Sequence, residues 1–239
     1  MHKKPQTNSI RIIAGEWRGR RLQVLDREGL RPTTDRVRET LFNWLMPDVS
    51  GARCLDLFAG TGALGLESLS RGAAYVQFCE MDRAAAGLLT KNVGTLMGSA
   101  TSSSTSTSTS SSASESDRAD VVCSDALRYL KQVNATPFDI VFLDPPFEGL
   151  EILREALLLI HQRGLIAPEG LVYIENNRFD DPFSTSDNEK SLSISADDSL
   201  EHAKGALVLA DGSPVFMEYR SKEAGKARFG LYVYKGLSV

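Results

Sequence analysis

The sequence predicts an α/β protein in which helices cover both faces of a mainly parallel, seven-stranded sheet. The first observation is that short, almost continuously apolar runs alternate with amphipathic segments from residue 53 onward. Such apolar runs are typical of strands that are buried on both faces of a parallel sheet. The second observation is that two β-rich runs stand close together near the end of the chain. Their closeness predicts a terminal antiparallel hairpin.

The N-terminal part is expected to form a small β-hairpin followed by a helix. Residues 10–24 hold two β-rich runs on either side of a glycine-containing turn, which is typical of a hairpin. Residues 31–46 read RPTTDRVRETLFNWLM, with apolar side chains at helical spacing: Val37, Leu41, Trp44 and Leu45. Thr33 or Thr34 is the expected N-cap of this helix.

The main domain is expected to alternate strands with helices. We predict strands over residues 53–58, 74–80, 119–124, 138–144 and 170–176. We predict helices over residues 63–72, 82–97, 125–133 and 151–163. The terminal hairpin is expected to pair the runs at 214–220 and 227–235. We therefore divide the chain into an N-terminal extension, residues 1–30, and a main domain, residues 31–239.

Two segments interrupt this alternation. Residues 99–116 contain 15 serines or threonines among 18 residues, a composition that cannot form a core and predicts a disordered insertion. Residues 178–205 are polar and acidic and are expected to form a second insertion.

The composition narrows the class of protein. The first 46 residues carry ten lysines and arginines against five acidic residues, whereas the whole chain has a net charge of −4. A basic end on an acidic body favours contact with an anionic partner such as a nucleic acid. The chain shows no signal peptide and no run long enough to span a bilayer. Its three cysteines are isolated, so we expect buried thiols and a reducing compartment such as the cytoplasm. The three histidines are also scattered, so we expect no metal site. We further expect a monomer.

The segment LDLFAGTGALGLES, residues 55–68, contains the pattern G-x-G-x-x-G at Gly60, Gly62 and Gly65. An acidic residue, Glu80, follows 20 residues after the first glycine. This pattern occurs in dinucleotide-binding loops. It is a weak signal alone, because other nucleoside-containing ligands also need a tight turn beside a ribose-binding acid.

A more specific signal is DPPF at residues 144–147, directly after a predicted strand. Two prolines remove two backbone N–H donors and fix φ, so the loop is rigid and rich in acceptors. The Asp144 carboxylate, the neighbouring carbonyl groups and the Phe147 ring suit an exocyclic amine on a flat base. In a doubly wound sheet, both loops lie at the carboxyl ends of strands, where ligands bind.

The order and spacing of LDLFAGTGALGLE, CEMD, SDA and DPPF resemble S-adenosylmethionine-dependent amino-methyltransferases. RIIAGEWRGRRL, LRPTTDRVRETLFNWL and DIVFLDPPF resemble, more narrowly, the bacterial RsmD-type 16S ribosomal RNA guanine-N2 methyltransferases. The resemblance covers about residues 10–96, 119–177 and 214–235. It implies a Rossmann-like class I methyltransferase fold and a substrate in 16S ribosomal RNA or the small ribosomal subunit.

The resemblance also implies roles for individual residues. The residues expected to bind S-adenosylmethionine are Thr34, Asp56, Phe58, Gly60, Gly62, Glu80, Met81, Asp125 and Ala126. Those expected to receive the target guanine and catalyse transfer are Asp144, Pro145, Pro146 and Phe147. Those expected to contact RNA are Arg11, Trp17, Arg18, Arg20 and Arg21, the indole by stacking on a base.

Four other functions compete with this hypothesis. A nicotinamide oxidoreductase shares the glycine loop but gives DPPF no role. An adenine-N6 methyltransferase on DNA or RNA shares both loops but does not account for the helix at 31–46. A protein-amide methyltransferase would not need the arginine-rich hairpin. A non-catalytic RNA-binding assembly factor would not need the acidic residues at the strand ends.

Overall fold

The computed structural model describes residues 8–25, 34–100, 118–146, 149–180, 182–183 and 215–236. Seven strands form one sheet in the order β5-β4-β3-β6-β7-β9-β8, and β1 and β2 form a separate two-stranded sheet. The five strands β3 to β7 are parallel where their registers are given, and β8 and β9 add antiparallel neighbours. The predicted α/β fold with a terminal antiparallel hairpin is therefore confirmed.

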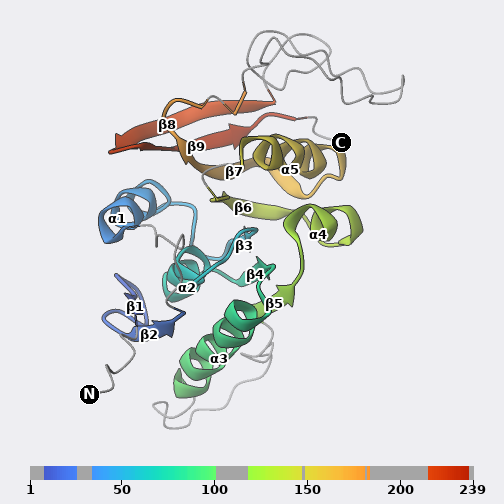
Figure 1. Cartoon of the computed structure of the whole chain (residues 1–239). Helices are drawn as coiled ribbons and strands as arrows, with labels where there is room; N and C mark the ends of the chain where they lie inside the picture. Colours follow the sequence, from blue (N-terminus) through green and yellow to red (C-terminus); the bar gives the residue numbers. More distant parts are fainter. Residues whose placement is uncertain are drawn as a thin grey trace, which may run out of the picture. The chain divides into compact units, whose positions relative to one another are not determined.

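The chain divides into two compact units, Met1–Tyr129 and Leu130–Val239, each of which is described by itself. The described strands of the first unit are β1 (Asn8–Arg11), β2 (Arg21–Val24), β3 (Arg53–Asp56), β4 (Tyr75–Glu80) and β5 (Ala119–Cys123) (Figure 1). Its helices are α1 (Asp35–Trp44), α2 (Ala63–Ser70) and α3 (Arg83–Ala100), followed by α4 (Ala126–Gln132), which runs into the second unit. The predicted domain boundary at residue 30 stays a prediction.

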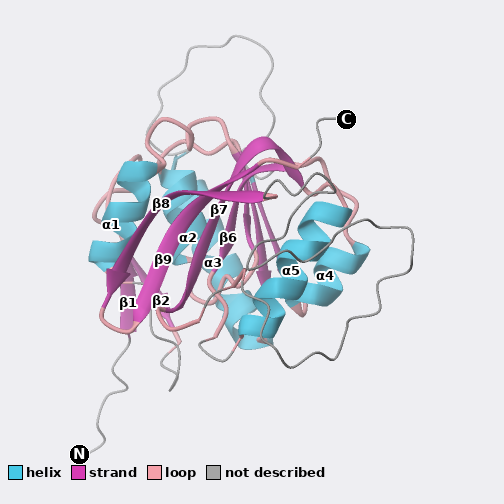
Figure 2. Ribbon diagram, turned by 90° about the horizontal axis from the view of Figure 1, so that it is seen from above, coloured by secondary structure: helices cyan, strands magenta, loops and turns pink. Residues whose placement is uncertain are grey.

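The second unit contains β6 (Phe138–Leu143), α5 (Leu150–Gln162), β7 (Ile166–Asn177), β8 (Phe216–Ala224) and β9 (Ala227–Tyr234). Figure 2 shows β6, β7, β9 and β8 as neighbouring strands. β7 begins four residues earlier than predicted. The terminal hairpin turns at Gly225, whose φ is 64°, so β8 continues to Ala224, into residues that we had assigned to the turn, whereas β9 begins at Ala227 as predicted.

The two predicted insertions lie mostly outside the described residues. Of residues 99–116, only the first two are described, as the end of α3. Of residues 178–205, only 178–180 and 182–183 are described. The predicted disorder of these insertions stays a prediction.

The predicted N-terminal helix is confirmed as α1, with Thr34 as its N-cap. The Thr34 hydroxyl accepts the backbone N–H of Val37 at 3.4 Å. The expected apolar stripe is buried, but the same face also buries Arg38, whose residue is only 1% exposed. A guanidinium in that position needs charged partners nearby, because an unpaired buried charge is very unfavourable.

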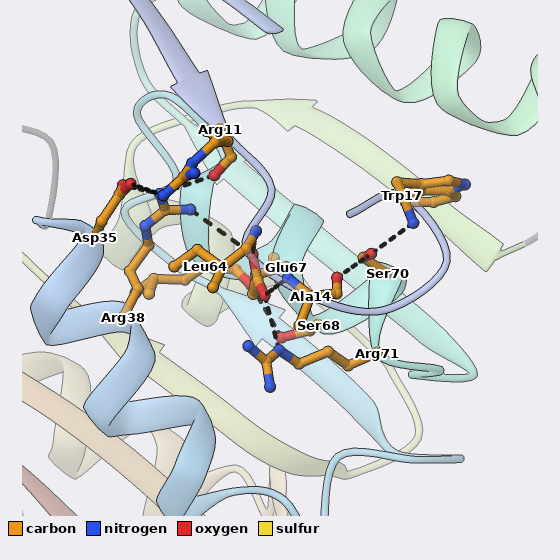
Figure 3. Close-up of polar contacts among 12 residues, drawn as sticks. Arg11, Ala14, Trp17, Asp35, Arg38, Leu64, Glu67, Ser68, Ser70 and Arg71 are labelled. Carbon is orange, nitrogen blue, oxygen red and sulfur yellow. Dashed lines mark hydrogen bonds and ion pairs between the residues drawn. The ribbon is translucent and has the colours of Figure 1, made fainter. Parts of the chain in front are cut away.

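Two carboxylates pair with this buried cation (Figure 3). Arg38 Nη2 donates to Oδ1 of Asp35 at 2.6 Å, and Glu67, a fully buried residue of α2, supplies the second carboxylate. Glu67 Oε2 lies 3.8 Å from Arg38 Nη1, and Glu67 Oε1 accepts the Nε–H of Arg71 at 2.8 Å. The same carboxylate accepts the backbone N–H groups of Ile13 and Ala14 at 2.8 and 3.0 Å. One side chain therefore joins the N-terminal hairpin, α1 and α2.

A second contact with α2 fixes the turn of the hairpin. The hydroxyl of Ser70 donates to the carbonyl oxygen of Ala14 at 2.6 Å and accepts the backbone N–H of Trp17 at 3.0 Å. Gly15 has a φ of 83°, and a Cβ at this residue would lie 1.8 Å from the carbonyl oxygen of Ser70. Only glycine permits both this backbone conformation and this close approach.

Replacing Glu67 with glutamine should destabilise the fold strongly. The change removes the buried negative charge beside Arg38 and Arg71 and turns an amide donor toward backbone N–H groups. We expect a loss of about 3 kcal/mol in the free energy of unfolding, as for other broken buried ion pairs. Urea unfolding followed by circular dichroism measures it, with Glu39→Gln on the exposed face of α1 as the control. Equal midpoints for the two variants would contradict this role.

Candidate active site

The glycine loop, residues 56–62, links the end of β3 to the start of α2. Asp56 is 3% exposed, and its Oδ2 accepts the backbone N–H of Gly65 at 3.0 Å. Gly62 is the N-cap of α2 with a φ of 76°, and Gly60 has a φ of 50°. These positive φ values explain why glycine stands at both positions, since other residues rarely adopt them.

Glu80, at the end of the neighbouring strand β4, braces this loop. Its Oε2 accepts the backbone N–H of Gly60 at 2.8 Å, and its Oε1 accepts that of Asp82 at 2.7 Å. Each carboxylate oxygen has a second lone pair, so both can still accept a hydroxyl group of a ligand. The structure therefore brings together Asp56, Gly60, Gly62 and Glu80, as the sequence predicted.

The third glycine of the motif serves packing. A Cβ at Gly65 would lie 2.1 Å from Cε1 of Phe78, a buried residue of β4. The absence of a side chain at Gly65 lets α2 approach the sheet closely. Gly65 also donates its backbone N–H to Asp56.

The electrostatic environment of Asp56 favours a cationic ligand. Burial raises the pKa of this carboxyl group to about 7, the hydrogen bond from Gly65 opposes the increase, and the charge of Glu80 adds to it. A positive group beside the loop would relieve both the desolvation and the repulsion between the two carboxylates.

The other residues that we predicted to bind S-adenosylmethionine differ in how exposed they are. Ala126 is buried, Phe58 is half-buried, and Met81 is 73% exposed. The carboxylate of Asp125 is exposed and accepts the backbone N–H of Arg128 at 2.9 Å, which caps the start of α4. Thr34 is exposed at the start of α1.

A shallow, mostly apolar pocket beside the glycine loop was not predicted. It is lined by Gly60 and Thr61, by residues of α3 that include Leu89, and by residues 23–25 at the end of the hairpin. The amide of Asn92 donates to the carbonyl oxygen of Gln23 at 3.0 Å and holds the hairpin against α3. The spacing of apolar residues in α3 indicates only a helix that packs on the sheet. The sequence therefore could not show that α3 also lines this pocket.

The proline loop, Asp144–Pro146, follows β6 in the second unit. Pro145 is buried, Pro146 is exposed, and the carbonyl oxygen of Pro146 accepts the backbone N–H of Gly149 at 2.8 Å. A Cβ at Gly149 would lie 2.8 Å from that oxygen, so the loop closes tightly on the start of α5. Phe147, which we expected to contact the base, lies outside the described residues.

The basic hairpin presents four exposed arginines: Arg11, Arg18, Arg20 and Arg21. Arg11 also forms an ion pair with Asp35 at 3.1 Å. Trp17 differs from our expectation, because its side chain is only 2% exposed and packs in the core. Its indole ring therefore cannot stack on a base in this conformation, and we correct that assignment. Hairpin periodicity alone does not show which side of the turn is covered.

The described residues also bear on metal binding, membrane insertion and the cysteines. Within the described residues, no group of three or more histidine, cysteine, aspartate or glutamate side chains could hold a metal ion. Among the same residues, no helix is both long and apolar enough to cross a bilayer. Cys54 and Cys79 are buried as expected, whereas Cys123 on the edge strand β5 is exposed, against our prediction.

Comparison with known proteins agrees with these observations. Residues 10–191 match the family model described as Conserved hypothetical protein 95. The chain is 49% identical over 177 residues to the protein named ribosomal RNA small subunit methyltransferase D of Escherichia coli, which covers 73% of this chain and 79% of that protein. A solved structure from Escherichia coli, described as a candidate methyltransferase (yhhF), has a TM-score of 0.69 and 37% identity, covering 96% of this chain and 100% of the other.

A more distant solved structure shares the fold alone. It is described as a candidate S-adenosylmethionine-dependent methyltransferase from Streptococcus mutans, with a TM-score of 0.57 and 13% identity. It covers 97% of this chain and 56% of the other.

The fold and the relatives together define a methyltransferase with a Rossmann-like α/β sheet. The chain belongs to the Conserved hypothetical protein 95 family, the family of the RsmD-type enzymes whose motifs it resembles.

The raised pKa of Asp56 predicts that the fold loses stability as the pH rises. Below about pH 4 the carboxyl group is protonated in both the folded and the unfolded chain. Between about pH 4 and pH 7 only the unfolded chain releases the proton, so the free energy of unfolding falls, by about 4 kcal/mol at most.

The test compares the wild type with Asp56→Asn in urea unfolding across this pH range. Since the variant lacks the titrating group, the difference between the two curves isolates Asp56 from other carboxyl groups. Parallel curves would show that the pKa of Asp56 is ordinary.

Proposed function

We propose that this methyltransferase transfers a methyl group from S-adenosylmethionine to the exocyclic N2 amine of a guanine in the 16S ribosomal RNA of the small ribosomal subunit. The observation that carries the proposal is the pairing of two kinds of loop in a member of this family. A carboxylate-braced glycine loop follows β3, and a rigid proline loop follows β6. The Escherichia coli relative is named as a small-subunit ribosomal RNA methyltransferase.

The residues of the glycine loop fit S-adenosylmethionine, which supplies an activated methyl group on a positively charged sulfur. Asp56 offers a buried carboxyl group whose ionised form a nearby cation would stabilise. The backbone at Gly60 and Gly62 allows close approach to a ligand. Glu80 retains lone pairs for ribose hydroxyl groups.

The other residues that we assign to S-adenosylmethionine are chosen by their positions near the ends of strands or helices. Phe58, Met81, Asp125 and Ala126 follow β3, β4 and β5, and we assign them to the nucleoside part of the donor. We assign Thr34, at the start of α1, to the segment that covers the methionine part. The Streptococcus mutans neighbour is described as S-adenosylmethionine-dependent, in agreement with this choice.

The proline loop holds the amine that accepts the methyl group. A carboxylate at Asp144 and the carbonyl oxygen of Pro145 can accept the two N–H bonds of a guanine N2 amine. These contacts orient the nitrogen and stabilise the positive charge that develops on it. We assign Phe147 to stacking on the guanine ring. The base must leave its stack to reach such a loop, which a nucleotide in an RNA loop can do at low cost.

The exposed arginines of the hairpin supply the contact with RNA. Arg18, Arg20 and Arg21 surround a turn that the contacts with α2 hold in place. Guanidinium groups bind phosphate oxygens in bidentate geometry, so this surface fits the RNA backbone. We further propose that the protein acts as a monomer in the cytoplasm, where small ribosomal subunits are assembled.

Methyl transfer from tritiated S-adenosylmethionine tests the function directly. Small ribosomal subunits, partly assembled subunits and free 16S ribosomal RNA are each incubated with the enzyme, and the modified nucleotide is mapped by digestion and mass spectrometry. N2-methylguanosine in the RNA is the expected product. N6-methyladenosine, or label in ribosomal protein, would refute the proposal. Absence of donor binding would instead favour an RNA-binding assembly factor.

Asp144→Ala should abolish methyl transfer while leaving the affinity for S-adenosylmethionine nearly unchanged. The reason is that Asp144 contacts only the methyl acceptor in this assignment. Equilibrium binding of labelled donor and single-turnover transfer measure the two properties, and Asp139→Ala at an exposed position of β6 is the control. Equal losses of binding and transfer would place Asp144 in the donor site.

Reversing the charge of two hairpin arginines, Arg18→Glu with Arg20→Glu, should weaken RNA binding and flatten its salt dependence. Each lost phosphate contact reduces the slope of log K against log salt concentration by about 1. Filter binding across a salt series measures the slope. The charge-matched control is Lys222→Glu with Lys226→Glu in the terminal hairpin. Unchanged RNA binding by the arginine variant would disprove the RNA contact.

A further inference from the structure

The end of β7 brings a second acidic side chain to the proline loop. β6 and β7 are parallel neighbours in which Phe142 pairs with Tyr173 (Figure 2). Side chains two residues apart along a strand point to the same face of the sheet. Asp144 therefore follows Phe142 on one face, and Glu175 follows Tyr173 on the same face. Neighbouring strands lie about 4.8 Å apart, so one purine can reach both carboxyl groups.

A buried tyrosine fixes the position of Glu175. The hydroxyl of Tyr173 donates to Oε2 of Glu175 at 2.7 Å. The Tyr173 ring is fully buried and packs edge-on against Phe142, with ring centroids 6.3 Å apart. Burial raises the pKa of Tyr173 well above its ordinary value, and the charges of Glu175 and Asp144 raise it further. Tyr173 thus remains a hydroxyl donor, and Asp144 is close enough for its charge to act on it.

Glu175 keeps one oxygen for another partner. Within the described part of the chain, the Tyr173 hydroxyl is its one hydrogen-bond donor, and that donor contacts Oε2 only. The residue is half-buried, so Oε1 can meet a ligand where water is partly excluded. Burial raises the pKa of the carboxyl group, whereas the hydrogen bond from Tyr173 lowers it and supports the ionised, accepting form.

The chemistry of the purines identifies what this oxygen can distinguish. Guanine carries an N1–H donor directly beside its N2 amine, so it offers adjacent donors to two neighbouring acceptors. Adenine has an acceptor lone pair at N1, which a carboxylate repels. A site that hydrogen-bonds an N–H of its substrate strongly rejects an analogue that lacks it, because the buried acceptor is then left unpaired.

We propose that Glu175 accepts the N1–H of the target guanine and thereby makes the acceptor site select guanine over purines without that hydrogen. The inference rests on the proposed function, in which Asp144 and the Pro145 carbonyl oxygen accept the adjacent N2 amine. Glu175 is a specificity residue for that reaction, and Tyr173 is the residue that positions it.

The experiment replaces the mapped guanosine with 2-aminopurine riboside in ligated 16S ribosomal RNA, assembled into the substrate particle. This base keeps the 2-amine but has a lone pair at N1. The wild type should prefer guanine by about 10- to 100-fold in kcat/KM. Glu175→Gln should reduce this preference at least about 10-fold, because an amide can donate to N1 of 2-aminopurine. Glu169→Gln, an exposed change on the same strand, should keep the wild-type preference.

Tyr173→Phe gives a second test that keeps the negative charge of Glu175. Loss of the orienting hydroxyl should lower the preference for guanine while donor affinity and the circular dichroism spectrum stay unchanged. A preference equal to the wild type in both variants overturns the assignment of Glu175. If the wild type forms no N2-methylguanosine at all, the proposed function itself fails, so the two failures are distinguishable.

Discussion

The N-terminal half of this enzyme depends on one buried carboxylate. Glu67 is fully buried, yet it meets a guanidinium from α1, a second one from Arg71 directly after α2, and two backbone N–H groups of the hairpin. A buried charge is tolerated only when it is paired, so moving any of these partners away from Glu67 would cost free energy of folding. A two-stranded hairpin is at best marginally stable alone in water. Its shape and its position on α2 therefore follow from Glu67 and Ser70 more than from its own strand pairing.

The same short helix also holds the glycine loop. α2 has eight residues, all buried; its first turn contacts Asp56 through the Gly65 N–H, and its second half carries Glu67 and Ser70. The proposed donor loop and the proposed RNA-binding hairpin are thus fixed to opposite ends of one rigid element. Because both ends are held by hydrogen bonds to buried groups, a shift of the hairpin would disturb the start of the helix. The proposed sites for RNA and for S-adenosylmethionine therefore share a structural support.

The sequence predicted the strand–helix alternation and the glycine loop because those features are local. Apolar runs mark parallel strands, and positive φ values demand glycine at Gly60 and Gly62. It could not predict the burial of Arg38 and Glu67, since charged residues at helical spacing normally indicate a solvated face. Nor could it predict that Trp17 is buried, because its turn is held by Ser70, which lies 53 positions further along the chain. Glu175 was read as part of an apolar strand, and only the register between β6 and β7 gives it a chemical context.

The burial of Trp17 has a consequence for how RNA is recognised. With the indole in the core, the exposed hairpin offers arginines, which bind phosphates without reading the base sequence. Affinity can then come from the first unit, while discrimination between bases must come from the site that receives the target base. In the second unit, the site that we propose for this base has a rigid loop with few N–H donors and a carboxylate that accepts a hydrogen bond from a buried tyrosine. Such a site preferentially binds a base edge that presents adjacent N–H groups, and guanine is the standard purine that does so.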